Sequence, residues 1–427
     1  MSDLLEKVIG ELGARNPEAA FFVPGRIEVL GKHTDYAGGR SLLVALERGF
    51  CIAAAARSDR LIRIRDAARG LEDSFELSQE LEKRPREWAD YPRTVARRLA
   101  RDFPGSLRGA DLALASDLPD EAGLSSSSAL VVAVFLALAS VLGLEEHPLY
   151  LQHLESREKL AEYLACVENG YAFGPWPGDR GVGTQGGSQD HTAILCCRAG
   201  KLSQYSFRPV RLEREIPLPP GHLLAVAVSG VRAPKTGSAL ENYNRLSELA
   251  QQLAKIWRES GAGNQPHLGA VLESSSQAAN QLRRAVEASA LPPPRIRSLL
   301  DRLQQFESEA CQIIPAVPDG WRQDELDKLA SLVDRSWKLG AELLGNQTPE
   351  TLHLTQQARR LGALAASPFG AGFGGSVWAL VEGDRSESFL ESWSADYAQA
   401  FTEPFCHSTF FLSKAASAAF QIPLESQ

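Results

Sequence analysis

The 427-residue sequence predicts a mixed protein of class α/β (α+β), with a change in organisation near residue 212. Before this point, short apolar stretches typical of strands alternate with loops and helices; beyond it, mostly helical periodicity continues to about residue 365. Length alone predicts about three domains at roughly 150 residues each, although large enzymes often use two. The change in pattern places one boundary, between segments 1–212 and 213–427.

The elements are expected in the following order. An amphipathic helix opens the chain with MSDLLEKVIGEL, and a second helix carries the arginines near residues 93–101. A long apolar helix is expected to begin at about Ser126 and to end at Gly143, since glycine commonly ends helices. A Pro-marked break interrupts the later helices near residues 292–294. Strands are expected at 20–23, 26–30, 41–46, 49–56, 111–118, 193–197, 223–228, 377–381 and 410–412.

The charge of the chain excludes one class of partner. Lys and Arg number 45 against 53 Asp and Glu, so the formal net charge is −8 and the sequence pI is about 5.6. Binding to a phosphate backbone requires a basic face, so a general nucleic-acid binder is not expected. The run Arg93, Arg97, Arg98 and Arg101 is therefore interpreted as a solvated helix face.

The cysteines and the apolar segments predict a cytoplasmic protein. The six cysteines include no CxxC pair and no zinc-type spacing, as expected for reduced thiols. The N-terminus lacks the basic and continuous apolar segments of a signal peptide. The longest apolar run, residues 129–144, has 16 residues, fewer than the roughly 20 that cross a bilayer. A buried helix is expected there, and no membrane partner.

Three glycine-rich segments resemble nucleotide sites. Gly25–Thr34 contains Gly-Lys, but His33 stands where a Walker A loop needs Ser or Thr. Gly181–Gly186, GVGTQG, matches the dinucleotide fingerprint GxGxxG, but that fingerprint must open a helix and a strand is expected to follow here. Gly370–Val381 also continues into an expected strand. A dehydrogenase built on GVGTQG is therefore a minor alternative.

The segment PDEAGLSSSSAL, which begins at Pro119, satisfies the physics of phosphate binding. A strand leads into a glycine-containing turn, and four serines then stand at the start of a long helix. Unpaired backbone N–H groups and the helix dipole favour anions there, and serine hydroxyls add donors. The alternative is that Ser125–Ser128 only cap the helix, which one serine could do. Two carboxylates, Glu168 and Asp190, could serve a phosphotransferase by holding Mg²⁺ or an acceptor hydroxyl.

These motifs together resemble the GHMP small-molecule kinases, and within them the galactokinases. PGRIEVLGKHTDYAGG resembles the family's sugar signature, PGRVNLIGEHTDYNGG, and the serine segment resembles its PxGxGLSSSA motif. SPFGAGFGGSVWALV resembles its third motif, and GGSQDH and VSGVRAPKTGSALENYNRL are weaker matches. All five occur in the family's order between residues 20 and 381.

The resemblance implies a two-domain GHMP kinase fold with the active site in the interdomain cleft. It implies ATP and Mg²⁺ as cofactors, with Ser127 and Glu168 as metal ligands. Asp190 would act as base or electrostatic anchor beside the acceptor hydroxyl, and Arg26 would pair with it. The expected substrate-binding residues are Lys32, His33, Asp35, Gly187 and Tyr243. The expected ATP-binding residues are Gly123, Leu124, Ser125, Ser126, Ser127, Ser128, Gly372, Gly374 and Gly375.

Departures from the family pattern raise a hypothesis about the substrate. Lys32 replaces the signature glutamate, and a cation there would suit a sugar with a carboxylate at C6, such as galacturonate or glucuronate. The alternative is that Lys32 points to solvent or pairs with Glu28, which replaces the signature asparagine. His33 and Tyr36 are expected to shape the turn rather than to carry protons. An inserted GPWPGDRG lengthens the approach to Asp190, and His191 replaces a glutamine.

The sequence thus predicts ATP-dependent phosphorylation of a monosaccharide or sugar acid at the anomeric hydroxyl. The presence of Lys32 predicts a substrate that carries a carboxylate at C6. The alternatives are a true galactokinase and a catalytically silent galactokinase-like sugar sensor. The partners expected are the small-molecule substrate and, at most, a second copy in a weak homodimer, with no nucleic acid and no membrane.

Overall fold

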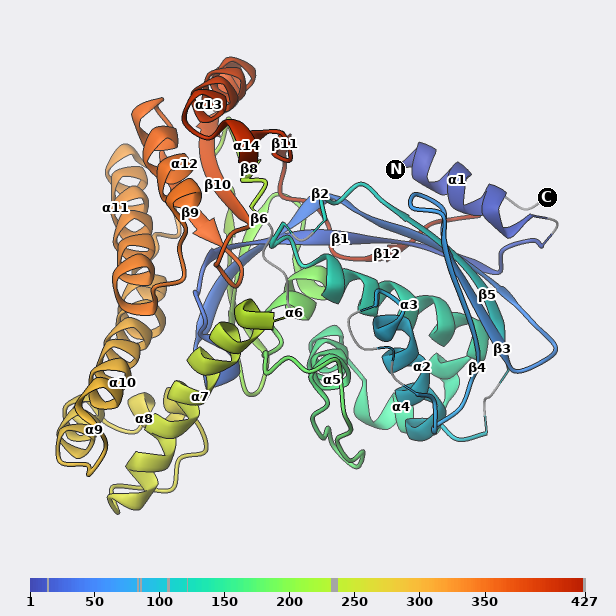
Figure 1. The fold of residues 1–427 in the computed structure, drawn as a ribbon, viewed down its shortest axis with the longest axis horizontal. Coiled ribbons are helices and arrows are strands. Elements are labelled where there is room, and N and C mark those ends of the chain that lie inside the picture. Colours follow the sequence, from blue (N-terminus) through green and yellow to red (C-terminus); the bar gives the residue numbers. More distant parts are fainter. Residues whose placement is uncertain are drawn as a thin grey trace.

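The computed structural model describes residues 1–13, 15–82, 84, 87–105, 108–120, 122–231 and 237–424. Its strands form two antiparallel-rich sheets, each covered by helices (Figure 1). The larger sheet is built mainly from the first half of the chain, and the smaller one from the second half. The mixed α/β architecture predicted from the sequence is confirmed.

The larger sheet has eight strands, six of which lie in the order β12-β1-β2-β5-β3-β4, with β6 and β7 added along one end of β2. In the described part of the chain, only β3 and β5 pair in parallel. The strands are β1 (Ala19–Leu30), β2 (Arg40–Ala56), β3 (Leu61–Asp66), β4 (Leu71–Glu76), β5 (Ala110–Ser116), β6 (Lys201–Ser206), β7 (Arg211–Pro217) and β12 (Phe420–Gln421).

The long hairpin of β1 and β2 carries the first motif. The sequence predicts two strands on each side of it, but the structure has one continuous strand on each side. The pairing register shifts between Pro24 and Arg26, which is the signature of a bulge. Proline cannot donate to the ladder, so a bulge allows the strand to continue past it. The motif residues that follow Pro24 are thus held on a rigid strand.

Helix α3 (Ser126–Leu142) packs against β1 and β2 in the main core. It has the bounds expected from the sequence and ends at Gly143, whose φ of 66° is left-handed. Helix α1 (Ser2–Leu12) lies on the opposite face of the sheet (Figure 1). Among the described residues, no helix is long and apolar enough to cross a membrane. The other helices of this half are α2 (Asp90–Asp102), α4 (Pro148–His153), α5 (Arg157–Asn169) and α6 (Gln189–Cys196).

Two sequence interpretations are wrong. The apolar stretch 193–197, expected as a strand, forms the end of α6 as far as Cys196. Its residues Ala193–Leu195 are buried on all sides, so they lack the periodicity that separates a helix from a strand. The arginines of α2 are not a solvated face either. Arg93, Arg97 and Arg98 are buried and pair with carboxylates.

One of these ion pairs anchors the inserted segment. Asp179 of GPWPGDRG accepts a hydrogen bond from Nε of Arg97 at 3.0 Å. Trp176 in the same segment is buried, and its Nε1 donates to the carbonyl of Asp102 at 3.0 Å. The insertion therefore packs on α2 as a fixed part of the fold.

The smaller sheet has the order β11-β8-β10-β9 and is antiparallel throughout. Its strands are β8 (His222–Val228), β9 (Ala365–Phe369), β10 (Ser376–Glu382) and β11 (Thr409–Ser413). Residue 212, the predicted boundary, falls within β7, so the change from one sheet to the other comes a few residues later. The short terminal strand β12 returns to pair with β1, which ties the C-terminus to the first sheet.

Helices of the second half cover this sheet and extend beyond it (Figure 1). The α-helices are α7 (Gly237–Glu259), α8 (Leu268–Glu273), α9 (Ala278–Glu287), α10 (Pro293–Phe306), α11 (Gln323–Leu339), α12 (Pro349–Arg360), α13 (Ser386–Ala400) and α14 (Thr402–Phe405). Two π-helices follow α10 and α11, namely η3 (Glu307–Ile313) and η5 (Gly340–Leu344). Short 3₁₀ turns are η1 (Asp35–Ala37), η2 (Leu144–Glu146), η4 (Ile314–Ala316) and η6 (Gly383–Arg385).

Candidate active site

A cleft of about 490 Å³ gathers residues from both halves of the chain. Its walls come from β1, the serine segment, the end of α5, the loop 182–188, the start of α6, α7 and the glycine-rich loop after β9. Most predicted site residues line it: Arg26, His33, Asp35, Gly123, Ser125, Ser126, Ser127, Ser128, Glu168, Gly187, Asp190, Tyr243, Gly372 and Gly374. Lys32, Leu124 and Gly375 do not line it.

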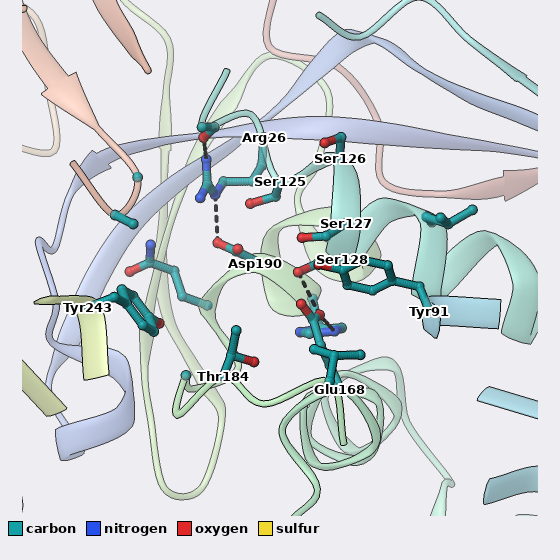
Figure 2. A pocket seen from close by; sticks show the side chains of 18 of the residues that line it. Arg26, Tyr91, Ser125, Ser126, Ser127, Ser128, Glu168, Thr184, Asp190 and Tyr243 are labelled. Carbon is teal, nitrogen blue, oxygen red and sulfur yellow. Dashed lines mark hydrogen bonds and ion pairs between the residues drawn. The ribbon is translucent and has the colours of Figure 1, made fainter. Parts of the chain in front are cut away.

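The serine segment opens into the cleft at the start of α3 (Figure 2). Ser125 occupies the N-cap position in a left-handed conformation, with φ 60°, and its side chain makes no capping hydrogen bond. Its buried hydroxyl has no hydrogen-bond partner in the described part of the chain. A capping serine would use this oxygen on a backbone N–H group. The geometry therefore favours the phosphate interpretation over simple capping.

Three side chains that line the cleft form a cluster around one carboxylate: Glu168, Ser128 and His191. The Ser128 hydroxyl donates to Oε2 of Glu168 at 2.8 Å, and Nε2 of His191 lies 3.0 Å from the same oxygen. Glu168 is buried at the end of α5, where Gly170 ends the helix with φ 79°. Carboxylate and hydroxyl oxygens are hard donors of the kind that Mg²⁺ prefers. The cluster is thus chemically suited to a magnesium ion held together with phosphate oxygens.

Asp190 and Arg26 form an ion pair at the centre of the cleft. Nε of Arg26 donates to Oδ1 of Asp190 at 2.8 Å, and its Nη1 donates to the carbonyl of Gly123 at 2.6 Å. Figure 2 shows Asp190 between Tyr243 on one side and the serines on the other. Arg26 is 3% exposed, so the pair is weakly screened on the arginine side. The pair links the acceptor side of the cleft to the serine segment.

The signature turn, defined as residues 31–37, follows β1. His33 adopts φ 58°, which is uncommon for a residue with a side chain. Its Nε2 lies 3.0 Å from the carbonyl of Ala371 and must donate to it, so Nδ1 accepts from the Tyr36 hydroxyl at 3.1 Å. Burial lowers the pKa of His33 to about 3. A neutral histidine that bonds on both sides shapes the turn, as expected from the sequence.

Asp35 lies beside Asp190 on the same side of the cleft. Oδ2 of Asp35 accepts from the backbone N–H of Gln189 at 3.0 Å, and burial raises the pKa of Asp35. Gly187 is tightly packed here, because a Cβ on it would lie 2.4 Å from that same oxygen. The Tyr243 ring lies 5.5 Å from the ring of His33. These groups form a polar wall with one aromatic face, a combination suited to a sugar ring.

Lys32 does not contribute to this wall. Its side chain is 1% exposed, and Nζ donates to the Ser367 hydroxyl of β9 at 2.8 Å. Nζ also lies 3.9 Å from Oε1 of Glu28. Lys32 therefore lies outside the lining of the cleft, and pairing with Glu28, the alternative left open by the sequence, fits the geometry. The reason is that the chain turns after Gly31 and directs the ammonium toward the smaller sheet.

Glu28 lines the cleft in place of Lys32. Its Oε2 accepts from Nε2 of Gln189 at 3.1 Å. Burial raises the pKa of Glu28 to about 7, against the opposing effect of the cations Lys32 and Arg26. Glu28 is thus partly protonated at neutral pH, and Lys32 provides no cation at this wall for a C6 carboxylate.

The glycine-rich loop after β9 lines the cleft and packs against the turn before the serines, since a Cβ on Gly370 would lie 2.9 Å from the carbonyl of Gly123. Gly372 has φ 80°, and a Cβ there would lie 2.2 Å from the carbonyl of Asn346. Glycine is therefore required by packing as well as by conformation. Gly375 instead pairs its backbone with Ser229 and Val231, which explains why it does not line the cleft.

Some residues that line the cleft were not predicted from the sequence. Glu28, Asn169, Thr184 and Gln189 all line the cleft. Asn169 orders the loop before Asp190, since its Oδ1 accepts from the Thr184 hydroxyl and from the N–H of Gly186, each at 2.7 Å. The only available signal was adjacency: Asn169 follows Glu168 and Gln189 precedes Asp190. Part of the weak motif at 228–246, residues 232–236, lies outside the described residues.

Comparisons with known proteins agree with this geometry. The galactokinase galactose-binding signature matches residues 10–56, the GHMP kinase N-terminal domain matches 90–175 and the GHMP kinase C-terminal domain matches 322–399. A galactokinase of Chloroflexus aggregans is 31% identical over 381 residues, which cover 88% of this chain and 87% of that protein. The chain belongs to the galactokinase family. It is therefore an ATP-dependent sugar kinase of the GHMP superfamily.

Other members of the galactokinase family extend this likeness. A galactokinase of Roseiflexus is 30% identical over 90% of this chain and 88% of that protein. The crystal structure of Lactococcus lactis galactokinase complexed with galactose has the same fold, with a TM-score of 0.81, 21% identity and 99% of both chains covered. The two-domain GHMP kinase fold expected from the motifs is thus confirmed.

The GVGTQG segment also finds its explanation within this fold. The sequence argument rejected a dinucleotide site because a strand was expected to follow, and that reason is wrong, since α6 follows. The segment instead comes after helix α5, whereas the fingerprint must leave a strand. Gly181 packs on the end of α5, where a Cβ would lie 2.4 Å from the backbone nitrogen of Gly170. Gly181 thus serves packing beside Glu168, whose carbonyl would lie 2.6 Å from that Cβ.

Proposed function

We propose that this kinase phosphorylates galactose at its anomeric hydroxyl. The observation that carries the proposal is the Arg26–Asp190 pair, which lies between the signature turn and the serine segment. Support for galactose comes from the galactose-binding signature over residues 10–56 and from curated relatives named galactokinase. Lys32, the cation expected to bind a C6 carboxylate, does not line the cleft, which favours a neutral sugar over a uronic acid.

In the proposed reaction, the sugar lies against the signature turn and Tyr243, with its acceptor hydroxyl beside Asp190. Asp190 accepts the hydroxyl proton or holds it through a hydrogen bond, and Arg26 fixes the carboxylate and balances the charge that develops on the transferring group. ATP phosphates lie at the N-terminus of α3, where backbone N–H groups and serine hydroxyls face the cleft. Positioning and charge stabilisation supply most of the rate, as expected for phosphoryl transfer.

Magnesium belongs to the same proposal. Glu168 would hold it, together with the Ser127 hydroxyl predicted from the sequence, while Ser128 orients the carboxylate through its 2.8 Å hydrogen bond. No group of three or more His, Cys, Asp or Glu side chains arranged for a metal occurs among the described residues. That fits Mg²⁺ in phosphotransferases, which keeps water and substrate phosphates as most of its ligands. When bound, the ion would neutralise phosphate charge.

A coupled ADP-release assay over galactose, galacturonate, glucuronate and arabinose tests the proposal. We expect turnover with galactose and little with either uronate. Preference for a uronate would overturn the substrate assignment, and no ADP release with any sugar would favour the silent sensor.

Two further expectations accompany the enzyme. All six cysteines are free, as in the reducing cytoplasm that we propose as its location. A monomer or weak homodimer stays a prediction, which sedimentation at several protein concentrations would check.

A further inference from the structure

The signature turn belongs to the first half of the chain, yet the second half holds its backbone. The N–H of Gly31 donates to Oε1 of Glu309 at 2.7 Å, and Nε2 of Gln305 donates to the carbonyl of Lys32 at 3.0 Å. The guanidinium of Arg302 donates to the carbonyl of His33. Three consecutive residues of the turn are thus bonded by three side chains from far along the sequence.

These three side chains share one helical face. Positions 302, 305 and 309 follow the spacing of three and four residues that aligns side chains along a helix. The backbone changes from α10 to the π-helix η3 before Glu309, and π-helical turns often occur at functional sites. All three residues lie outside the segments that the family descriptions match, 10–56, 90–175 and 322–399.

The burial of Arg302 argues against a purely incidental contact. Its side chain is 1% exposed, and the acceptors found for it are neutral oxygens of His33, Leu246, Gln305 and Tyr36. Its charge also faces the ring of Tyr36 at 5.7 Å. A buried cation without a carboxylate partner carries a large desolvation cost. A hydrogen-bonded network that orders one turn gives this cost a physical purpose.

The turn that this network bonds has an uncommon conformation. His33 has a left-handed φ of 58° and lines the cleft, and its neighbour Asp35 lines it too. Local hydrogen bonds satisfy only part of the turn, such as the Thr34 hydroxyl on the carbonyl of Gly31 at 2.9 Å. The carbonyls of Lys32 and His33 point instead at Gln305 and Arg302. Removing these donors would leave buried carbonyls unsatisfied and favour another backbone conformation.

We propose that Arg302, Gln305 and Glu309 form an α10 clasp that sets the signature turn in its sugar-binding conformation, so that the second half of the chain controls sugar affinity. These are positioning residues: they line no part of the cleft and act through the backbone of the turn. The proposal rests on the proposed function only in placing the sugar at this turn.

Three clasp variants test the proposal by steady-state kinetics. We expect Arg302→Gln, Gln305→Ala and Glu309→Leu each to raise KM for the sugar by about tenfold or more, with KM for ATP changed by less than about threefold. Glu309→Gln keeps an oxygen that accepts from Gly31 and from Ser336, so it should retain near wild-type KM. A near wild-type KM in Glu309→Gln would show that the hydrogen bonds of this side chain, and not its negative charge, hold the turn.

A control on the same helix separates the clasp from general helix damage. Arg295 of α10 donates to Gln252 of α7 at 2.8 Å and makes no bond to the turn. Arg295→Gln should leave both KM values unchanged. A variant that raises both KM values in parallel, or an Arg295→Gln effect as large as that of Arg302→Gln, would overturn the proposal.

A second measurement needs no substrate. Hydrogen–deuterium exchange of peptides covering 31–37 should accelerate in the three disruptive variants, while peptides covering 125–128 stay as in wild type. Unchanged exchange at 31–37 in all three variants would refute the clasp. The kinetic arm uses whichever sugar wild type turns over best, so a preference for another sugar would contradict the galactose assignment without affecting the test of the clasp.

Discussion

The ammonium of Lys32 donates to the hydroxyl of Ser367 at 2.8 Å and lies 3.9 Å from the carboxylate of Glu28. This contact joins the signature turn, which follows β1 of the larger sheet, to β9 of the smaller one. The family signature has glutamate where Lys32 stands and asparagine where Glu28 stands. The two departures therefore act as a pair: a carboxylate and a cation that face each other in the interior.

The pairing predicts strong coupling between the two positions. Lys32→Glu alone would bury a second carboxylate beside Glu28, and we expect it to lower the free energy of unfolding by roughly 3–5 kcal/mol. The double variant Glu28→Asn with Lys32→Glu restores the family pattern and should recover at least half of that loss. Urea unfolding of the two single variants and the double variant gives the coupling energy. Strictly additive effects would contradict the pairing.

Asp190 and Arg26 are expected to control turnover and not ATP affinity. Asp190→Asn removes the charge that accepts or anchors the acceptor proton, so we expect kcat to fall by roughly 10²-fold to 10⁴-fold. The dissociation constant of ATP, measured by calorimetry without sugar, should stay within about threefold of wild type. Asp319→Asn, at an exposed carboxylate, is the matched control. Wild-type kcat in Asp190→Asn would remove Asp190 from its assigned role.

Ser125 separates phosphate binding from helix capping. Loss of a true N-cap typically costs about 1 kcal/mol of stability. Because its hydroxyl caps nothing here, Ser125→Ala should leave the melting temperature unchanged and raise KM for ATP several-fold. Ser128→Ala serves as the comparison, since it breaks the hydrogen bond to Glu168. A clear drop in melting temperature with unaltered KM for ATP in Ser125→Ala would support capping instead.

His33 predicts a specific response to acid. The pKa of His33 is about 3 in the folded protein, against an ordinary value of 6.5. The unfolded chain therefore binds a proton below pH 6.5 while the folded one does not, so this contribution to stability is present above pH 6.5 and is lost as pH falls toward 3. Relative to His33→Gln, wild type should lose about 1.4 kcal/mol per pH unit between pH 6 and 4.5.

Glu28 changes stability with pH in the direction opposite to His33. The variant Glu28→Gln is therefore measured together with His33→Gln. Its pKa of about 7, raised from 4.5, means that the folded protein binds the extra proton, and stability falls as pH rises from 4.5 to about 7. Glu28→Gln should therefore gain stability relative to wild type as pH rises through this window. Urea unfolding at several pH values checks both variants. A difference from wild type that does not vary with pH would contradict the corresponding pKa.

Much of the fold and of the cleft could be predicted from local patterns. The bounds of α3, its end at Gly143 and the serine segment at its start follow from an apolar run between a serine cluster and a glycine. The motif order also identified the residues around Asp190 and Glu168. Helix α6 was missed because a short stretch buried on all sides carries no periodicity, and the α2 arginines were misread because their carboxylate partners are distant in sequence.

The chemistry of the cleft was therefore readable from residue types and their spacing, since a helix N-terminus with free N–H groups and serines attracts phosphate wherever it occurs. The direction in which a side chain points could not be predicted from residue types and their spacing. Whether Lys32 faces the sugar or Ser367, and whether Arg302 reaches the carbonyl of His33, depends on how two sheets and a distant helix pack together. Such contacts join residues hundreds of positions apart, and only the folded chain brings them within hydrogen-bonding distance.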